Sequence, residues 1–319
     1  MSAIAVVGSL NIDLVIRASH CPRQGETVIG SSFGMAGGGK GSNQALAAAR
    51  LNAKSYMIGC VGNDDFGRKL RTVLNDNGVD CSHLETRKEA ATGTAVITVT
   101  DEGESSIVIS QGANSLLDSN AIFSAKKIFE DSDCALFQME SPARTVVSGL
   151  KFAKQSGCKT FLSADPPFSL PSEVWTSIDY LILNEKALSF YAKSSDSQSD
   201  SQSHSHSIIK MAREIQNRGV KVLVVTQSAK GGMIFTNEGE YFPFDAFNIR
   251  AVDNTGARDA FCAGFCVALS EGRPIKAAAK FGAACGALAC TKIGAHPSLP
   301  WRHQVSALLG ESGDDEYEL

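Results

Sequence analysis

The chain of 319 residues carries a formal net charge of -4, and 43% of its residues are hydrophobic. This length and apolar content suit one large α/β domain or two small ones. The charge balance excludes the basic field with which nucleic-acid-binding proteins neutralise phosphates, so we expect no nucleic-acid partner.

The first predicted element is a buried strand at 4–7, which ends at Gly8. The apolar runs elsewhere also fall short of the twenty or so residues that span a bilayer. We therefore expect a cytoplasmic protein with no signal peptide and no membrane contact. The nine cysteines are scattered without a CxxC pair, which favours reduced core thiols over disulfides or zinc ligands.

Strand and helix patterns then alternate along the chain, which predicts parallel βαβ winding with helices on both faces of one sheet. Strands are expected at 4–7, 55–60, 135–138, 160–163, 180–183 and 222–226. Helices are expected at 41–51, 66–77, 143–156, 207–218, 258–271 and 275–290.

Two segments, 14–33 and 92–111, break this alternation. We expect antiparallel strands there, outside the main sheet, that form a small β lid over the carboxyl ends of the core strands, where open α/β sheets bind ligands. The α/β core then consists of 1–13, 34–91 and 112–319.

The segment 194–207 alternates serine with Asp, Gln and His and lacks apolar residues. Such a composition cannot offset the entropy of ordering, so we expect a disordered surface insertion within the core. His204 and His206 are assigned no function.

A glycine run, Gly37-Gly38-Gly39-Lys40-Gly41, opens directly into an alanine-rich helix. Backbone without Cβ atoms can approach a polar ligand closely. The run has neither the Walker A spacing nor the position of a Rossmann GxGxxG motif, and a purely structural turn is the alternative.

The segment 253–261 leads from a turn into another helix. Small residues at a helix start present free amides to an anion, and the carboxylate of Asp259 in that first turn could take a proton from a hydroxyl. This pattern suits phosphoryl transfer, although Asp259 as a simple first-turn acidic residue is an equal alternative.

Together these motifs resemble the two signature regions of the ribokinase family of carbohydrate kinases, often called the PfkB family. The resemblance covers nearly the whole chain, and the GSxNxD, GGKGxNQ and QxESP combination is similar to the ribokinase branch rather than to the adenosine kinase or fructokinase branches. It implies a three-layer αβα fold with a central, mostly parallel sheet and a small β-sheet lid. Further matching segments lie at 8–13, 22–28, 61–67, 138–142 and 294–298.

The resemblance implies ATP-dependent phosphorylation of D-ribose to D-ribose 5-phosphate, with Asp259 as the general base. Carboxylates and amides suit vicinal hydroxyls because they accept or exchange hydrogen bonds. For Asp13, a plain strand-end residue is the alternative. The implied sugar-binding residues are Asn11, Asp13, Gly39, Lys40, Asn43, Glu140 and Asp259.

The resemblance also implies a nucleotide end, where the amides of 256–259 would stabilise the transferring phosphoryl group. Mg²⁺ would be held weakly through Glu185. The implied ATP-binding residues are Asn184, Thr226, Ser228, Gly231, Gly256, Ala257 and Arg258. A monovalent cation such as K⁺ would be held at Asp253, Thr255, Ala289, Gly294 and Ser298, although turn formation alone also explains Gly294.

Three residues depart from the family pattern: Arg258 replaces the third residue of GAGD, Ala187 the glutamate of NxxE, and Ser228 a loop glycine. Arg258 could pair with Asp259 and lower its basicity, or its charge could stabilise the transferring phosphoryl group. On balance we expect impaired turnover. Ala187 should weaken the hold on Mg²⁺, with Glu185 as a partial substitute.

Three hypotheses therefore stay open: a ribokinase, a kinase of another sugar or nucleoside, and a non-catalytic sugar- or nucleotide-binding pseudokinase. A dehydrogenase is disfavoured because the first strand lacks the glycine motif that a dinucleotide needs. The exposed edges of the lid strands predict a homodimer.

Overall fold

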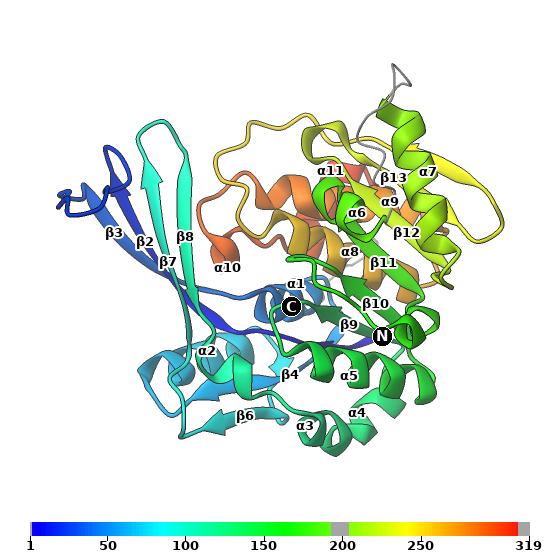
Figure 1. Ribbon diagram of the computed structural model, residues 1–319, viewed down its shortest axis with the longest axis horizontal. Helices are drawn as coiled ribbons and strands as arrows, with labels where there is room; N and C mark the ends of the chain where they lie inside the picture. Colours follow the sequence, from blue (N-terminus) through cyan, green and yellow to red (C-terminus); the bar gives the residue numbers. More distant parts are fainter. Residues whose placement is uncertain (1, 193–203, 312–319) are drawn as a thin grey trace, which may run out of the picture.

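A large twisted sheet forms the centre of the protein in the computed structural model, which describes residues 2–192 and 204–311 (Figure 1). Nine of its strands follow in one hydrogen-bonded order: β14 (Tyr241–Phe244), β13 (Gly232–Thr236), β12 (Val222–Thr226), β11 (Tyr180–Asn184), β10 (Lys159–Ser163), β9 (Cys134–Gln138), β1 (Ala3–Val7), β4 (Lys54–Gly62) and β5 (Val79–Asp80). The short β6 (Leu84–Arg87) also pairs with β4. The sheet is parallel from β12 to β5, and β13 and β14 add an antiparallel edge.

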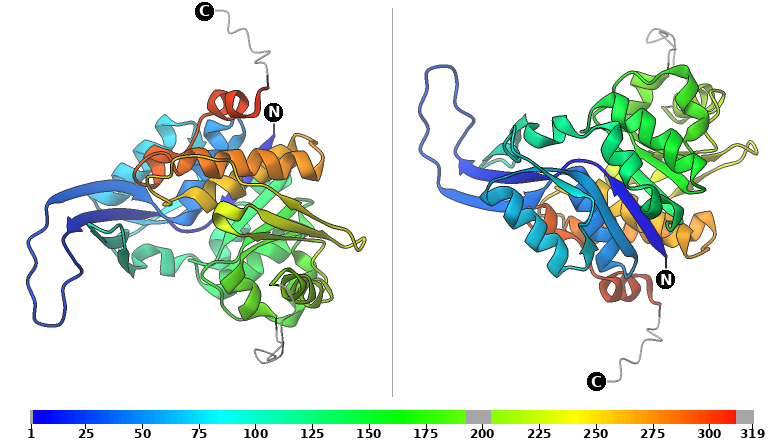
Figure 2. Two further views of the ribbon diagram at one scale, coloured as in Figure 1. Left: turned by 90° about the horizontal axis from the view of Figure 1, so that it is seen from above. Right: turned by 90° about the horizontal axis from the view of Figure 1, so that it is seen from below.

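Helices cover both faces of this sheet (Figures 1 and 2). One face packs against α1 (Lys40–Arg50), α2 (Asp65–Asp76), α8 (Ala257–Ser270), α9 (Ile275–Ala289) and α11 (Arg302–Leu309). The other packs against α3 (Ser119–Ser124), α4 (Lys126–Glu130), α5 (Ala143–Gln155), α6 (Glu185–Tyr191) and α7 (His204–Gln216). This arrangement confirms the predicted three-layer αβα fold.

The composition of the central strands explains the two cores. Along β1, Ile4 and Val6 point into one core, whereas Ala5 and Val7 point into the other, and all four are buried. Because successive side chains of a strand point to opposite faces, a strand covered on both sides must be apolar throughout. The continuous apolar run at 4–7 meets this requirement.

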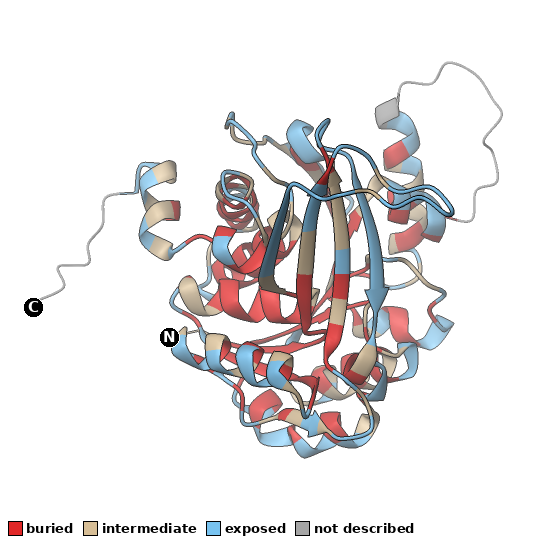
Figure 3. Ribbon diagram, turned by 90° about the vertical axis from the view of Figure 1, so that its left-hand side faces the viewer, coloured by how far each residue is buried: buried red, intermediate tan, exposed pale blue. Residues whose placement is uncertain are grey.

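A second sheet of four strands projects from one end of the core; we call it the lid sheet (Figures 1 and 3). Its order is β3 (Ser32–Gly38), β2 (Asn11–Ala18), β7 (Gly93–Thr100) and β8 (Ser105–Ser110). Figure 3 shows that the ends of β2 and β7 nearest the core are buried and that β8 is exposed along its length.

The lid sheet differs from the prediction in two respects. Strands β2 and β7 pair in parallel, whereas the sequence interpretation expected antiparallel strands throughout; the outer pairs are antiparallel. The sheet also begins nearer the site, because Asn11 pairs with Gly38 at its base. The lid strands therefore carry site residues that the predicted boundaries assigned to the core.

The predicted core strands and helices are present, with ends that differ by a few residues. The serine-rich prediction at 194–207 lies mostly outside the described residues, and α7 begins within it, at His204. All nine cysteines are unpaired. Among the described residues, every helix is too short or too polar to span a bilayer.

Candidate active site

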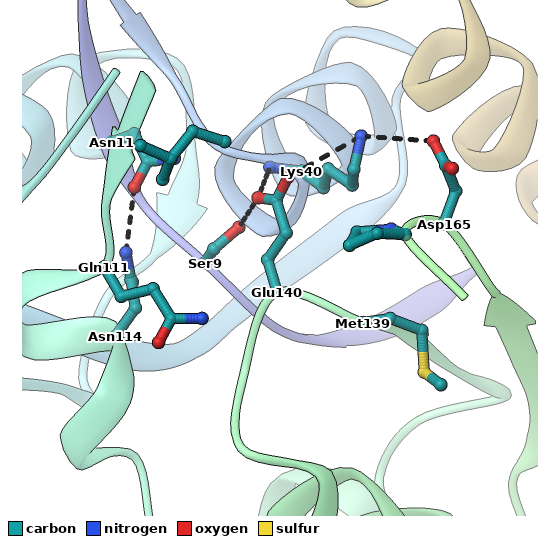
Figure 4. Close-up of a pocket in the computed structure, with 10 residues that line it drawn as sticks. Ser9, Asn11, Lys40, Gln111, Asn114, Met139, Glu140 and Asp165 are labelled. Carbon is teal, nitrogen blue, oxygen red and sulfur yellow. Dashed lines mark hydrogen bonds and ion pairs between the residues drawn. The ribbon is translucent and has the colours of Figure 1, made fainter. Parts of the chain in front are cut away.

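A cavity of about 440 Å³ opens where the lid sheet meets the carboxyl ends of β1, β9 and β10 (Figure 4). This is the edge at which parallel α/β sheets bind ligands. Side chains from segments far apart in the sequence meet there. The lining residues are Ser9, Asn11, Lys40, Ile109, Gln111, Asn114, Met139, Glu140, Asp165 and Pro166.

The glycine run spans the end of β3, the linking residue Gly39 and the start of α1, and it packs against Asn11 and Asp13. A Cβ atom at Gly38 would lie 2.2 Å from Oδ2 of Asp13, and one at Gly39 would lie 2.7 Å from the backbone nitrogen of Asn11. Gly39 also has a φ of 91°, which only glycine adopts easily. These glycines therefore permit the close approach that brings Lys40 to the cavity.

Asn11, at the start of β2, is held by Asn114. Nδ2 of Asn114 donates to Oδ1 of Asn11 at 2.8 Å, while Oδ1 of Asn114 accepts from the backbone nitrogen of Leu10 at 2.9 Å. These buried hydrogen bonds fix the amide plane of Asn11 beside the cavity (Figure 4). Asn11 is thus oriented before any ligand binds.

Glu140 and Lys40 form the centre of the cavity wall (Figure 4). Ser9 donates to Oε2 of Glu140 at 2.6 Å, and Nζ of Lys40 lies 3.7 Å from Oε1 of Glu140 and 3.8 Å from Oδ2 of Asp165. Burial alone lowers the pKa of Lys40, but the negative charges of Asp259, Glu140 and Asp165 outweigh it and raise that pKa above its ordinary value. The surrounding carboxylates therefore favour the charged form of Lys40.

Asp259 lies in the first turn of α8, which packs against α1. Its carboxylate is buried and accepts hydrogen bonds of 2.8 Å from Nδ2 of Asn43 and from Nε2 of Gln44. Gln44 in turn accepts from Nε2 of Gln138 at 2.6 Å. Burial raises the pKa of Asp259, opposed by Lys40 and the two amides. A positioned carboxylate of raised pKa can serve as a general base.

Asp13 is a fourth carboxylate near Lys40, after Glu140, Asp165 and Asp259. Burial, together with the nearby charges of Glu140 and Asp259, raises its pKa from 3.8 to about 7, although Lys40 opposes the shift. The site thus concentrates negative charge around one lysine. Hydroxyl groups of a ligand would stabilise this charge because carboxylates accept hydrogen bonds.

The two helices that meet here, α1 and α8, begin differently from α6. Their N-cap residues are Gly39 and Gly256, which offer no side-chain cap, and Gly256 is left-handed with a φ of 78°. The N-cap of α6, Asn184, accepts from the backbone nitrogen of Ala187 at 2.7 Å. Uncapped first-turn amides can donate to an anion.

Four of the predicted ATP-binding residues, Asn184, Thr226, Ser228 and Gly231, lie at or just after the carboxyl ends of β11 and β12, where Asn184 and Thr226 are register partners. The other three, Gly256, Ala257 and Arg258, lie at the start of α8. Glu185 accepts a 3.0 Å hydrogen bond from Gln227. Ala187 is fully buried. Ser228 has a φ of 53°, a conformation that suits the glycine it replaces in the family pattern.

The residues predicted to hold a monovalent cation also converge. Oδ1 of Asp253 accepts from the backbone nitrogen and hydroxyl of Thr255 at 2.9 and 2.7 Å, and Oδ2 accepts from the backbone nitrogen of Gly294 at 2.8 Å. The hydroxyl of Ser298 lies 3.5 Å from the carbonyl oxygen of Thr255. The backbone nitrogen of Asp253 donates to the carbonyl of Cys290, beside Ala289.

These oxygens are the donors that a hard monovalent ion prefers. In the described part of the chain, His, Cys, Asp and Glu side chains form no group of three that could hold a metal ion.

Arg258 does not pair with Asp259, as one hypothesis suggested. Its Nη1 donates to Oδ2 of Asp165 instead. The guanidinium therefore points toward the cavity wall, and the proposed loss of basicity at Asp259 through such a pair has no basis in the geometry.

Sequence reasoning missed several groups that complete the site. Asn114, Gln44 and Gln138 orient other side chains through hydrogen bonds between distant segments. Gln44 and Gln138 belong to the GGKGxNQ and QxESP motifs but were assigned no role, and Asn114 lies outside the motifs. Asp165 did carry one, because it follows the buried strand β10 at the carboxyl edge of the sheet.

Comparison with known proteins gives a consistent result. The family described as pfkB family carbohydrate kinase matches residues 1–302. The chain is 34% identical to a ribokinase of Haemophilus influenzae over 308 residues, which cover 96% of this chain and 98% of the relative. It is 33% identical to a ribokinase of Bacillus subtilis over 309 residues, 97% of this chain and 100% of the relative.

Solved structures agree. A ribokinase from Thermotoga maritima superposes with a TM-score of 0.87 at 32% identity, covering 97% of this chain and 100% of the other. An Arabidopsis thaliana ribokinase complexed with ribose and ATP gives a TM-score of 0.87 at 29% identity, covering 98% and 100%.

Proposed function

The chain belongs to the pfkB family of carbohydrate kinases, and from this premise we propose that it is a ribokinase that converts D-ribose and ATP to D-ribose 5-phosphate and ADP. One observation carries the proposal. Asn11, Lys40 and Glu140 line one cavity, and Asp259 is hydrogen-bonded to the helix that brings Lys40 there. The site thus pairs a polyol-binding wall with a buried carboxylate of raised pKa.

In this proposal Asp13 and Glu140 accept hydrogen bonds from the sugar hydroxyls, and the amide of Asn11 exchanges hydrogen bonds with them. The glycine backbone at Gly39 lets the sugar lie close to α1. The primary hydroxyl faces Asp259, which takes its proton as the oxygen attacks the γ-phosphorus of ATP. Lys40 balances the carboxylates when the sugar is absent.

In this proposal the first turn of α8 binds the other reactant, ATP. Amides of Gly256, Ala257, Arg258 and Asp259 would donate to the transferring phosphoryl group, whose negative charge is spread over its three equatorial oxygens in the transition state. The ends of β11 and β12, with the turn at Gly231, would hold the nucleotide.

Two cations would support this end. Mg²⁺ bound with ATP would neutralise phosphate charge, with Asn184 and Glu185 nearby. K⁺ would be held beside the phosphate-binding turn by oxygen atoms of Asp253, Thr255, Ala289, Gly294 and Ser298.

We also propose a homodimer through the lid sheet. Pairing register places Met35, Val96 and Val108 in one row across β3, β7 and β8, and all three are exposed. Exposed apolar rows mark interaction surfaces. Light scattering at micromolar concentration should give a dimer mass for the native chain and a monomer for Val108→Asp; a strictly monomeric native chain would refute the dimer.

A specific observation favours a second candidate, a pseudokinase that binds sugar or nucleotide with little turnover. Ala187 is fully buried and provides no carboxylate, and Arg258 adds bulk beside the phosphate-binding amides. A kinase of another sugar or nucleoside is the third candidate.

A panel of acceptors separates these candidates. ADP formation is measured with ATP, Mg²⁺ and K⁺ in the presence of ribose, 2-deoxyribose, fructose or adenosine. The proposal predicts the highest kcat/KM with ribose. A higher value with another acceptor would reassign the substrate, and turnover with none of them would favour the pseudokinase.

A further inference from the structure

Arg258 stands at the junction of the two halves of the site. It is in the first turn of α8, directly before Asp259, and its guanidinium pairs with Asp165, which lines the cavity from the end of β10. The inference below rests on the proposed phosphoryl transfer.

Asp165 is shared between two cations. Its Oδ2 accepts from Arg258 and lies 3.8 Å from Nζ of Lys40, which is 3.7 Å from Glu140 (Figure 4 shows the Lys40 contacts). Charges of alternating sign therefore extend from the start of α8 to the sugar-binding wall. Removing the charge of Arg258 or of Glu140 therefore changes the electrostatic environment of Asp165.

The pair between Arg258 and Asp165 is suited to exchange. Both side chains keep solvent contact, at 33% and 28% of their surface, so water weakens their attraction. A phosphate carries more charge than a carboxylate and offers three oxygens to the planar guanidinium fork. A phosphoryl group at the first turn of α8 can therefore compete with Asp165 for the guanidinium.

The backbone amide of Arg258 also lies in the first turn of α8, where a phosphoryl group would bind. As the second residue of α8, it has an amide with no acceptor inside the helix, and Gly256 supplies no side-chain cap. An anion bound to these amides lies within reach of the guanidinium, because the arginine side chain is long and starts from the same turn.

We propose that Arg258 leaves Asp165 and binds the terminal phosphoryl group of ATP, contacting it during transfer, while Asp165 is the competing partner that holds the guanidinium when no phosphoryl group is bound. No covalent bond of Arg258 changes: the phosphoryl group passes from ATP to the sugar oxygen, ADP leaves with the bridging oxygen, and the proton of the sugar hydroxyl goes to Asp259. Arg258 thus contributes to catalysis instead of obstructing it.

A binding cycle tests this without requiring turnover. Calorimetry compares ADP with a non-hydrolysable ATP analogue, the imidotriphosphate, in the native chain, Arg258→Ala, Asp165→Asn and the double variant. Arg258→Ala should weaken the affinity for the analogue about tenfold. It should change the affinity for ADP less than about twofold, because ADP lacks the terminal phosphoryl group. Asp165→Asn should tighten the analogue about threefold, and only while Arg258 is present.

A matched pair supplies the control. Arg68 in α2 is also paired with an aspartate, Asp65, and both are exposed, so Arg68→Ala and Asp65→Asn change the same charges elsewhere. These variants should leave both affinities unchanged. The proposal is overturned if Arg258→Ala weakens the affinities for ADP and for the analogue equally. It is also overturned if Asp165→Asn changes the affinity for the analogue by the same factor with and without Arg258. Absence of ribose phosphorylation would instead count against the proposed function, since the binding readout is separate.

Discussion

The sugar end and the phosphate end of the site are built in different ways. At the sugar end Asn11 and Glu140 are each held by hydrogen bonds from neighbours, and Asp259 at the junction is buried under two amides. At the phosphate end Arg258 and Asp165 form a partly exposed ion pair. Buried networks fix geometry in advance, whereas exposed pairs can rearrange, so this contrast separates recognition of the sugar from handling of the phosphate.

The largest expected effect is at Asp259. Asp259→Asn removes the proton acceptor but keeps the side-chain size, so kcat should fall about a thousandfold while the Kd for ribose changes less than about threefold. An assay of ADP formation measures kcat, and calorimetry on the same preparation measures the Kd for ribose. Turnover equal to that of the native chain would exclude Asp259 as the base.

Asp13→Asn should weaken ribose binding about tenfold to a hundredfold, because a charged acceptor of hydroxyl hydrogen bonds is lost. The same change should stabilise the free protein. The folded pKa of Asp13, about 7, exceeds its value of 3.8 elsewhere, so folding disfavours the ionised form.

These two pKa values set how the stabilisation by Asp13→Asn depends on pH. The destabilisation is absent below pH 3.8 and fully present above pH 7, so the variant should gain about 2 to 4 kcal/mol of unfolding free energy at pH 8, and this gain should shrink as the pH falls toward 4. Urea titrations at pH 8 and pH 4 measure it. An equal gain at both values would show that the charge of Asp13 is not its source.

At the phosphate end, Arg258→Gly restores the residue of the family pattern. If Arg258 contacts the phosphoryl group, kcat should fall about tenfold with little change in the KM for ribose. A rise in kcat would show that the arginine obstructs the site, as the sequence alone suggested.

The smallest effect concerns Ser228, whose left-handed φ of 53° strains a residue with a Cβ atom. Ser228→Gly should raise the unfolding free energy by about 1 kcal/mol. Asn52, with a φ of 66°, is the control, because asparagine tolerates this region and Asn52→Gly should gain less. A loss of stability in the serine variant would mean that its side chain makes contacts worth more than the strain.

Much of the fold was predictable because the alternation of short apolar runs with helical patterns is a local signal. The parallel pairing of β2 with β7 was not, since it depends on where two segments far apart in the sequence leave the core. The antiparallel edge at β13 and β14 was also not predicted, although these strands pair as local hairpins. Asp259 could be singled out from its helix start. The partner of Arg258 could not, because Asp165 lies 93 residues away in the sequence.

Calorimetric titration of ribose, alongside an assay of ribose-dependent ADP formation with ATP, Mg²⁺ and K⁺ on the same preparation, tests the central claim most directly. We predict saturable ribose binding at one site per chain together with turnover that saturates over the same range of ribose concentration. Ribose binding without ADP formation would contradict the claim of a working kinase, and the absence of ribose binding would contradict the assignment of the cavity.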